Sequence, residues 1–459
     1  MTMLGIFGII ISLGLLMYLA YRGITVLILA PILAGLAALM SGDVPLMASY
    51  TEVFMTAFAG YAKAYFPLFL LGAIFGKLMD ESGAAKAIAH GITDKLGKGK
   101  AITAVVLSCG ILTYGGVSLF VVAFAVYPIA AALFREADVP KRFIPAAIAL
   151  GSFTFTMTAL PGTPQIQNAI PMPFFETTPW AAPFLGLIGA AVMFGGGVFW
   201  LQRRSKAAMA KGEGYGDHPN ENIKEIAYDE LPSLMMALLP IFLVLGLNFA
   251  LSKFVFANME AAYLADYGTS IAKVRGIWSI IISLVAAVLL TIALFKNKIG
   301  DVKNCVNQGA FGSLLAIVNT SSEVGYGNVI KTLGAFALVK TAILAIPGTP
   351  LISLAVSTSV LAGITGSASG GMSIALGALG DIYMQKALAL GINPQAFHRI
   401  AAMACGGLDS LPHNGAVITL LGICGLSHKE SYADIGMCTV VIPLIATAIA
   451  IVFATMGVV

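Results

Sequence analysis

Long hydrophobic runs without a charged residue dominate the chain. They cover residues 101–134, 143–175, 177–201, 341–380 and 437–459. Because about 20 consecutive apolar residues cross the hydrocarbon core of a bilayer, runs of this length predict membrane-spanning helices. The alternating polar pattern of a membrane β-barrel is absent from the sequence. The pattern therefore predicts an all-α polytopic membrane protein.

Two of the predicted spans are interrupted in the middle by helix-breaking residues. The run at 143–175 contains "LPGTPQ" (Leu160–Gln165), and a later one contains "LPHNGA" (Leu411–Ala416). Broken backbone is tolerated at membrane depth only where it lines a cavity or is buried in protein. Broken helices in inverted repeats are typical of secondary transporters. We expect the two breaks to face each other and to form a substrate site.

The two halves of the chain share short sequence words in the same order. "FGKLMDESG", "GGVS", "VPKRFIPAAIALGS" and "LPGTP" match "YGNVIKTLG", "GGMS", "NPQAFHRIAAMACG" and "LPHNG", with offsets of 251–255 residues. A hydrophilic stretch, 203–230, lies between the halves. The sequence therefore predicts repeat 1 at 1–202, a cytoplasmic linker at 203–232 and repeat 2 at 233–459.

One uncharged run in each repeat has an unusual length. As a helix, 101–134 would be about 51 Å long, too long for one crossing of about 30 Å and short for two. Basic residues flank both of its ends, and such residues favour the cytoplasm. We expect a re-entrant hairpin at about 101–134 with its tip at Gly115-Gly116; two short tilted spans are the alternative. The corresponding hairpin is expected at about 347–385, with its tip at Gly370-Gly371.

These elements define an inverted topology. Each repeat has three spans, a re-entrant hairpin, a broken span (about 143–175 and about 394–426) and a final span. Counting crossings places most of the chain's 26 lysines and arginines on the cytoplasmic side, as expected. Both termini are then predicted outside. The first apolar run lacks a cleavage site and is predicted to be a span rather than a signal peptide.

Composition narrows the class of function. The chain is 58% hydrophobic and only 10% charged, against about 25% charged residues in soluble domains. The net charge of +4 reflects basic loops and gives no reason to expect nucleic acid as a partner. The five cysteines are scattered in apolar segments, so buried thiols are expected rather than a metal site. No P-loop is present, and we expect a transporter without cofactor or metal, not an enzyme.

Polar and glycine residues at the tips and breaks are the candidate substrate ligands. Half-helices that start at the breaks would point their positive ends at a carboxylate. Because the set contains no arginine, we expect a substrate with one carboxylate; Arg399 is expected outside the membrane core. Membrane Ser and Thr often bond only to their own helix, which is the structural alternative. The candidates are Thr113, Gly115, Gly116, Ser118, Thr163, Gln165, Asn168, Ser369, Gly370, Gly371, Ser373, Ser410, His413 and Asn414.

Three ionisable residues in the predicted spans are candidates for ion coupling, because such residues are costly in a membrane and usually functional. We expect Asp409 to carry a coupled proton, since a dry site disfavours a charged carboxylate. Glu323 and His413 are rivals. Sodium is the alternative ion, held by "TGSASGG" and by carbonyls freed at the breaks. A passive anion channel, or an intramembrane hydrolase built on Asp409, Ser410 and His413, is a remote alternative.

Several segments resemble a known family. "FPLFLLGAIFGKLMDESGAAKAIA", "SSEVGYGNVI" and the block from "LTYGGVSLF" to "ALPGTPQIQNAIPMPFF" are similar to the gluconate permease (GntP) family of the ion transporter superfamily, most of all to its D-β-hydroxybutyrate permease members. The resemblance implies proton-coupled uptake of a small hydroxy-monocarboxylate across a bacterial inner membrane. It also implies a homodimer, each subunit having a scaffold domain and an elevator-type transport domain.

Overall fold

The computed structural model describes residues 2–218 and 230–459, and these residues form helices and turns without any strand. Within this described part of the chain, seven helices are long and apolar enough to cross a membrane, or up to nine if each of two sharply bent helix pairs counts as one span. The protein is therefore an all-α polytopic membrane protein, as the hydrophobic pattern predicts. Of the predicted linker at 203–232, the residues 219–229 lie outside the described part.

The part of the chain predicted as repeat 1 includes twelve numbered helices, the last of which extends past residue 202. A π-helical turn (Ser49–Phe54) joins the third to the fourth. The helices are α1 (Thr2–Tyr21), α2 (Val26–Ser41), α3 (Leu46–Ala48), α4 (Met55–Glu81), α5 (Ala84–Leu96), α6 (Ala101–Tyr114), α7 (Leu119–Glu136), α8 (Ile144–Ser152), α9 (Phe155–Thr158), α10 (Ile166–Ala169), α11 (Met172–Phe175) and α12 (Pro183–Met209).

Repeat 2 repeats this order with fewer interruptions. Its helices are α13 (Leu234–Ala250), α14 (Ile271–Ile299), α15 (Val302–Thr332), α16 (Phe336–Leu344), α17 (Pro350–Thr365), α18 (Ala368–Ala389), α19 (Pro394–Cys405), the 3-10 turn η7 (Leu408–Ser410), α20 (Gly415–Cys424), α21 (His428–Gly436) and α22 (Ile442–Thr455). The chain bends by 96° between α15 and α16.

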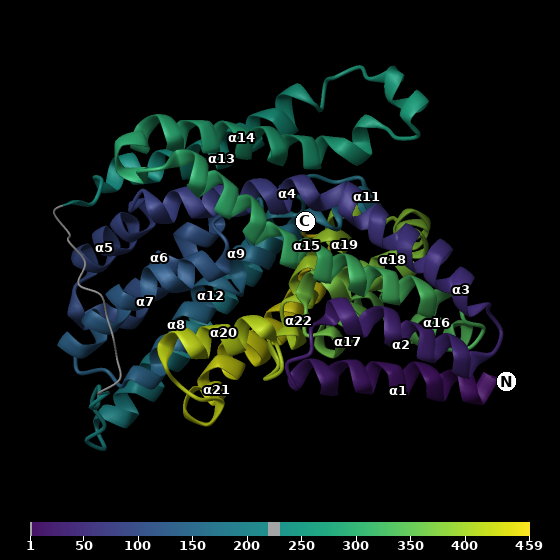
Figure 1. The fold of residues 1–459 in the computed structure, drawn as a ribbon, viewed down its shortest axis with the longest axis horizontal. Helices are drawn as coiled ribbons and strands as arrows, with labels where there is room; N and C mark the ends of the chain where they lie inside the picture. Colours follow the sequence, from purple (N-terminus) through teal and green to yellow (C-terminus); the bar gives the residue numbers. More distant parts are fainter. Residues whose placement is uncertain (1, 219–229) are drawn as a thin grey trace.

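Packing of the helices follows the duplication. The corresponding helices α4 and α15 lie along each other, and so do α12 and α22. The first hairpin, α6–α7, packs on α8 of its own repeat and on α20 of the other. The second hairpin, α17–α18, packs on α19 and, across the repeat boundary, on α10 and α11. In Figure 1, α13 and α14 run side by side along one edge and α1 lies along the opposite edge. Each hairpin therefore contacts both broken helices.

The second hairpin turns at a different place from the one predicted. The first turns at Gly115 and Gly116, as expected, because α6 ends at Tyr114. In the second, α17 ends at Thr365 and α18 begins at Ala368, so the turn lies at Gly366. The prediction of a tip at Gly370-Gly371 is wrong, because those glycines lie in the first turn of α18. Gly366 has a φ of 64°, a conformation that favours glycine.

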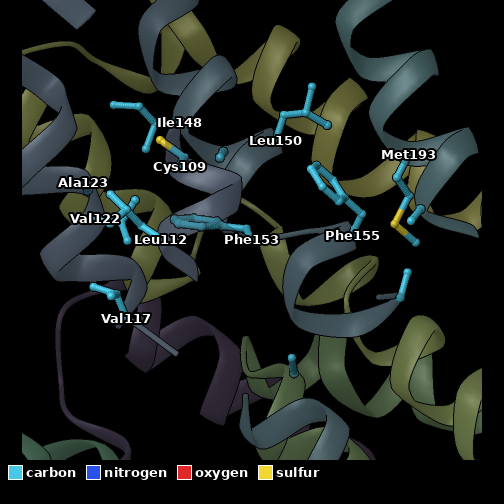
Figure 2. Packing of buried hydrophobic residues seen from close by; sticks show 14 of the residues in the cluster. Cys109, Leu112, Val117, Val122, Ala123, Ile148, Leu150, Phe153, Phe155 and Met193 are labelled. Atoms are coloured by element: carbon cyan, nitrogen blue, oxygen red, sulfur yellow. The ribbon is translucent and has the colours of Figure 1, made fainter. Parts of the chain in front are cut away.

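Small side chains allow the first hairpin to pack closely against the broken helix. Figure 2 shows Cys109 and Leu112 of α6 beside Ala123 of α7 and Ile148 of α8. A Cβ atom placed at Gly151 of α8 would lie 2.6 Å from Cβ of Cys109. The hydrophobic effect does not drive helices together within lipid, so close packing of this kind holds the helices together instead. It fixes the position of the first break relative to the hairpin.

Candidate functional site

At the first break, a glutamine side chain joins the broken helix to the tip of the first hairpin. Nε2 of Gln165 donates to the carbonyl oxygens of Thr113 (2.8 Å) and Val117 (3.3 Å). Gly116 has a φ of 99°, and a Cβ atom there would lie 2.9 Å from Cγ of Pro164. The tip therefore packs directly on the break. The Thr113 hydroxyl is buried there without a hydrogen-bond partner.

The second break is joined to its hairpin in the same way. Nδ2 of Asn414 donates to the carbonyl oxygen of Gly366 at 2.8 Å, and Asn414 is the residue that precedes α20. The ring of His413 lies against the same turn, 3.0 Å from the position of a Cβ atom at Gly366. Nε2 of His413 is buried without a partner. In both repeats, a side-chain amide from the break thus holds a carbonyl of the tip.

A buried carboxylate faces the start of α18. Glu323 lies inside α15 and is only 4% exposed. A methyl group at Gly370 would overlap the Glu323 carboxylate. Oε2 of Glu323, the hydroxyl of Ser373 and the hydroxyl of Tyr61 are all buried without hydrogen-bond partners. The hydroxyl of Ser369 lies 3.5 Å from that of Ser367, which caps α18.

Asp409 lies just before the second break, in η7, and is half-buried. Its Oδ1 accepts a hydrogen bond from the Ser410 hydroxyl at 3.1 Å. The carbonyl of Ser410 accepts one from the Tyr432 hydroxyl at 3.0 Å. Asp409 is therefore less enclosed than Glu323, whose carboxylate interacts with the Ser367 hydroxyl but leaves Oε2 without a partner.

The remaining candidates have packing contacts in this structure. Gly115 lies against the side chain of Ile241 and Gly371 against the backbone of α17. Ser118 precedes α7 and makes no capping bond. The buried hydroxyl of Thr163 accepts a long bond from the Gln165 amide at 3.4 Å.

Asn168 belongs to a buried network instead of pointing to an open site. Its Nδ2 donates to the carbonyl oxygens of Thr163 and Pro179, both at 2.9 Å. Its Oδ1 lies 3.0 Å from Nη1 of Arg399 and 3.1 Å from Nε2 of His398. The expectation that Arg399 lies outside the membrane core is wrong: Arg399 is fully buried in the protein against the first break. Asn168 has no hydrogen-bonding capacity left for a ligand.

The half-helix N-termini are less open than the sequence suggested. After the first break, α10 is a single turn of four residues that ends before Pro171, so it has little dipole. After the second, α20 has ten residues, but the amides of Ala416 and Val417 donate to Oδ1 of Asn414 at 2.7 and 3.0 Å. Neither break presents a row of free N–H groups of the kind expected for carboxylate binding.

The two breaks are connected through α19 rather than by direct bonds. Within the described ranges 2–218 and 230–459, no hydrogen bond is found between Thr163 or Gln165 on one side and His413 or Asn414 on the other. An apolar groove of about 610 Å³ lies elsewhere, between α2, α3 and Val329. The expectation that the two breaks, with Thr163, Gln165, His413 and Asn414, form one substrate site stays a prediction.

Comparison with known proteins places the chain among membrane transporters. No family model matches it. The uncharacterized transporter YxjC of Bacillus subtilis is 44% identical over 467 residues, covering 98% of this chain and 99% of YxjC. The chain belongs to the transporter family of YxjC. An uncharacterized transporter of Haemophilus influenzae is 41% identical over 85 residues, which is 18% of this chain and 20% of that protein.

One solved transporter has a similar fold. The crystal structure of the YdaH transporter from Alcanivorax borkumensis, described as having an unusual topology, aligns with a TM-score of 0.58 and 16% sequence identity. The alignment covers 90% of this chain and 89% of YdaH. At this identity the likeness concerns the fold alone. This chain, a member of the YxjC family, thus has a helical fold similar to that of a solved transporter.

Several residues around the breaks were not among the candidates from the sequence: Tyr61, Trp180, Gly366, Ser367, His398 and Arg399. Gly366 could have been found, because it lies 251 residues after Gly115, the same offset that relates the two proline breaks. Trp180 packs with its ring on Gly162 of the first break. The contact of His398 and Arg399 with the first break has no local sequence signal, since it joins different repeats.

Proposed function

We propose that this protein is a secondary active transporter that takes up a small hydroxy-monocarboxylate, such as 3-hydroxybutyrate or a gluconate-like acid, together with protons. The observation that carries the proposal is a group of buried polar atoms without partners at the two tips and breaks. They are Thr113 Oγ1, Glu323 Oε2, Ser373 Oγ and His413 Nε2. Buried polar atoms are nearly always hydrogen-bonded, so these atoms are the ones that a polar substrate would satisfy.

The choice of substrate class rests on residue chemistry and on resemblance. Hydroxyl and amide side chains suit a ligand with hydroxyl groups and a single carboxylate. Membership in a transporter family supports carrier-mediated transport, and the likeness to gluconate permeases supports a hydroxy acid, a bacterial inner membrane and a homodimer. An anion channel or an intramembrane hydrolase would leave the paired hairpins and breaks without a role.

Glu323 is the stronger candidate for the coupling proton, and Asp409 the weaker. The Glu323 carboxylate is enclosed between α15 and the start of α18, with Oε2 unpaired. A buried carboxylate that is not paired with a cation is very costly when charged, so the carboxylate would be protonated when the hairpin closes on it. Asp409 is half-buried and already accepts a bond from Ser410. Sodium in place of the proton is the alternative.

The coupling proposal is tested by uptake into proteoliposomes under an imposed inward proton gradient without sodium. A panel of labelled hydroxy acids identifies the substrate. Glu323→Gln is expected to exchange substrate across the membrane but not to accumulate it, while Asp409→Asn still accumulates it. Loss of accumulation in Asp409→Asn alone would transfer the role to Asp409. Uptake that requires sodium and ignores the proton gradient would refute proton coupling.

An elevator motion would slide the hairpins and broken helices past the first three spans of each repeat. A Cβ atom at Gly76 of α4 would lie 3.5 Å from Cγ2 of Val121 on α7, so this pair joins the two proposed bodies. We expect a disulfide in Gly76→Cys/Val121→Cys to stop transport and its reduction to restore it. The matched control is Gly110→Cys/Thr156→Cys, which joins α6 to α9 within the moving body, also at 3.5 Å. Unimpaired uptake in the fully oxidised first pair would contradict the motion.

The inverted topology is tested by cysteine labelling from each side of the membrane. All five native cysteines are buried, whereas Lys98, Asp138 and Glu176 are exposed. Lys98→Cys and Asp138→Cys should react only from the cytoplasm, and Glu176→Cys only from outside. Labelling of Asp138→Cys from outside would mean that the chain crosses the membrane once between residues 98 and 138, which would reject the re-entrant hairpin.

A further inference from the structure

Arg399 is a fully buried arginine whose hydrogen bonds all go to neutral oxygen atoms. Its Nε donates to the carbonyl of Ala181 at 3.2 Å. Nη1 donates to the carbonyl of Thr158 at 3.3 Å and to Oδ1 of Asn168 at 3.0 Å. Nη2 donates to the carbonyls of Pro179 and Ala181 at 3.4 and 2.8 Å. These five bonds use all five N–H groups of a guanidinium.

No carboxylate balances this charge at the first break. Among the salt bridges of the described residues, none involves Arg399, and its bonding partners are carbonyl and amide oxygens. The guanidinium cation is thus surrounded by four neutral oxygens: the backbone carbonyls of Thr158, Pro179 and Ala181 and the side-chain amide oxygen of Asn168. Carbonyl and amide oxygens of this kind are the ligands that hard metal cations prefer. The oxygens freed around the first break form a cation site, and a protein side chain occupies it.

Repeat 1 has no counterpart of this arginine, so the second break lacks the equivalent contact. In the aligned words "VPKRFIPAAIALGS" and "NPQAFHRIAAMACG", Arg399 corresponds to Pro145. At the other end of the network, Thr158, whose carbonyl accepts from Arg399, corresponds to Asp409 at an offset of 251 residues. The two breaks therefore differ in charge. The first holds a permanent cation, and the second carries an ionisable acid.

We propose that the first break contains a cation site permanently filled by the Arg399 guanidinium, which replaces a coupled metal cation there and supplies the fixed positive charge for an anionic substrate. Because every N–H of Arg399 is already bonded, the arginine acts through its charge and through the shape it gives the break, not by contact with the substrate. It is a positioning residue. The part of this inference that concerns the substrate rests on the proposed function; the part that concerns the cation site does not.

The cation site is tested without any substrate, by thermal unfolding of the purified protein in detergent. Arg399→Ala should lower the unfolding temperature. Low millimolar guanidinium chloride should restore much of the loss, whereas choline chloride at equal ionic strength should not. Sodium should stabilise Arg399→Ala more than the parent protein. The matched control is Arg275→Ala, since Arg275 also donates to a carbonyl of this loop, that of Glu176 at 3.2 Å, but is only partly buried. Guanidinium should not change the unfolding temperature of this variant.

Two further variants keep the test decisive if Arg399→Ala does not fold. Arg399→Lys keeps the positive charge with fewer donors, and Arg399→Gln keeps donors without charge. The unfolding temperature of Arg399→Lys is expected to lie above that of Arg399→Gln. An equal or higher unfolding temperature for Arg399→Gln would overturn the cation site. So would an increase in the unfolding temperature of Arg399→Ala by guanidinium no larger than that by choline. Equal stabilisation of Arg399→Ala and the parent protein by sodium would overturn it as well.

Transport provides the second readout. In proteoliposomes, Arg399→Gln should raise the KM for the substrate acid by about ten-fold or more, as expected when a buried charge is lost, with a smaller effect on the maximal rate. Arg399→Lys should retain KM within a few-fold. Equal KM values in both variants would reject the electrostatic role. If no acid is transported by the parent protein, the proposed function fails, but the unfolding experiment still decides the cation site.

Discussion

The bond between Asn414 and the second hairpin makes a specific prediction. Nδ2 of Asn414 donates to the carbonyl of Gly366, while Oδ1 caps the first amides of α20. Asn414→Ala removes both functions. Asn393→Ala is a matched control, because Asn393 caps α19, the other half of the same broken helix, through a bond from the Gln395 amide at 3.0 Å. Asn393 is exposed, and its side-chain bond goes to its own helix cap and not to the hairpin turn, so its loss affects a cap.

The two variants should differ by the contribution of the hairpin bond. Loss of a helix cap costs about 1 kcal/mol, within a range of roughly 0.5–2 kcal/mol. In Asn414→Ala the buried carbonyl of Gly366 also loses its partner, which costs about 1–3 kcal/mol more. A difference of this size changes the equilibrium for detachment of the tip by roughly five- to 150-fold. The effect should be confined to the second hairpin, since the first is held by Gln165.

Hydrogen–deuterium exchange read by mass spectrometry on the purified protein measures this detachment directly. Peptides covering residues 366–371 should exchange faster in Asn414→Ala by a factor in that range, and peptides covering 113–118 should not change. Asn393→Ala should leave both tips at parental rates. Gln165→Ala should give the mirror result, with faster exchange at 113–118 only. Parental exchange at 366–371 in a folded Asn414→Ala would refute the idea that the break holds the tip.

Two further predictions concern packing and pH. Gly370→Ala places a methyl group on the Glu323 carboxylate and should abolish uptake. The control Gly377→Ala lies on the same helix with open space around it and should transport normally. Equal activity of the two variants would contradict a closed contact at Glu323. The hydrogen bond from Arg142 holds the pKa of Glu213 below its ordinary value of 4.5. The ion pair therefore adds to the free energy of unfolding, by at most about 1 kcal/mol because both groups are partly exposed. This stabilisation is present above pH 4.5 and is lost as the pH falls below it. Thermal unfolding between pH 7 and 3.5 should therefore decline less steeply in Glu213→Gln, and identical curves would contradict the prediction.

The positions of most helices could be predicted because membranes impose strict local rules. The hydrocarbon thickness fixes the length of a span, and a helix cannot pass unbroken through residues such as Pro161-Gly162 or Pro412. Both breaks and the first hairpin turn follow from this reasoning. The second turn was misplaced because two glycines at 370 and 371 resemble the first tip, although Gly366 is the residue at the matching offset. Within α18 those glycines instead allow close packing, Gly370 on Glu323 and Gly371 on α17.

The continuity of the half-helices could be predicted only in part. The second half of the first broken helix was expected to be one helix, but Pro171 removes a backbone donor and leaves two single turns, α10 and α11. Asn414 was expected to bind substrate as a donor. It occupies the position before α20 where asparagine is favoured as a cap. Pro171 and the capping residue Asn414 could both be read from the sequence. Because one shortens a half-helix and the other occupies the free amides of the second, they weaken the argument that helix dipoles provide the positive charge of the site.

The charge of the first break depends on a contact that no local pattern contains. Arg399 and Asn168 are 231 residues apart in sequence, and their bond forms only because α19 of repeat 2 packs on α10 of repeat 1. From the sequence alone, an arginine near the start of a span is most simply placed at the membrane surface. Once it is buried, the cost of an isolated charge requires that every donor be bonded, and five hydrogen bonds to four neutral oxygens meet that requirement. The same duplication that creates two similar breaks thus brings one repeat's arginine to the other repeat's carbonyls, so that the pair of breaks is similar in backbone and unlike in charge.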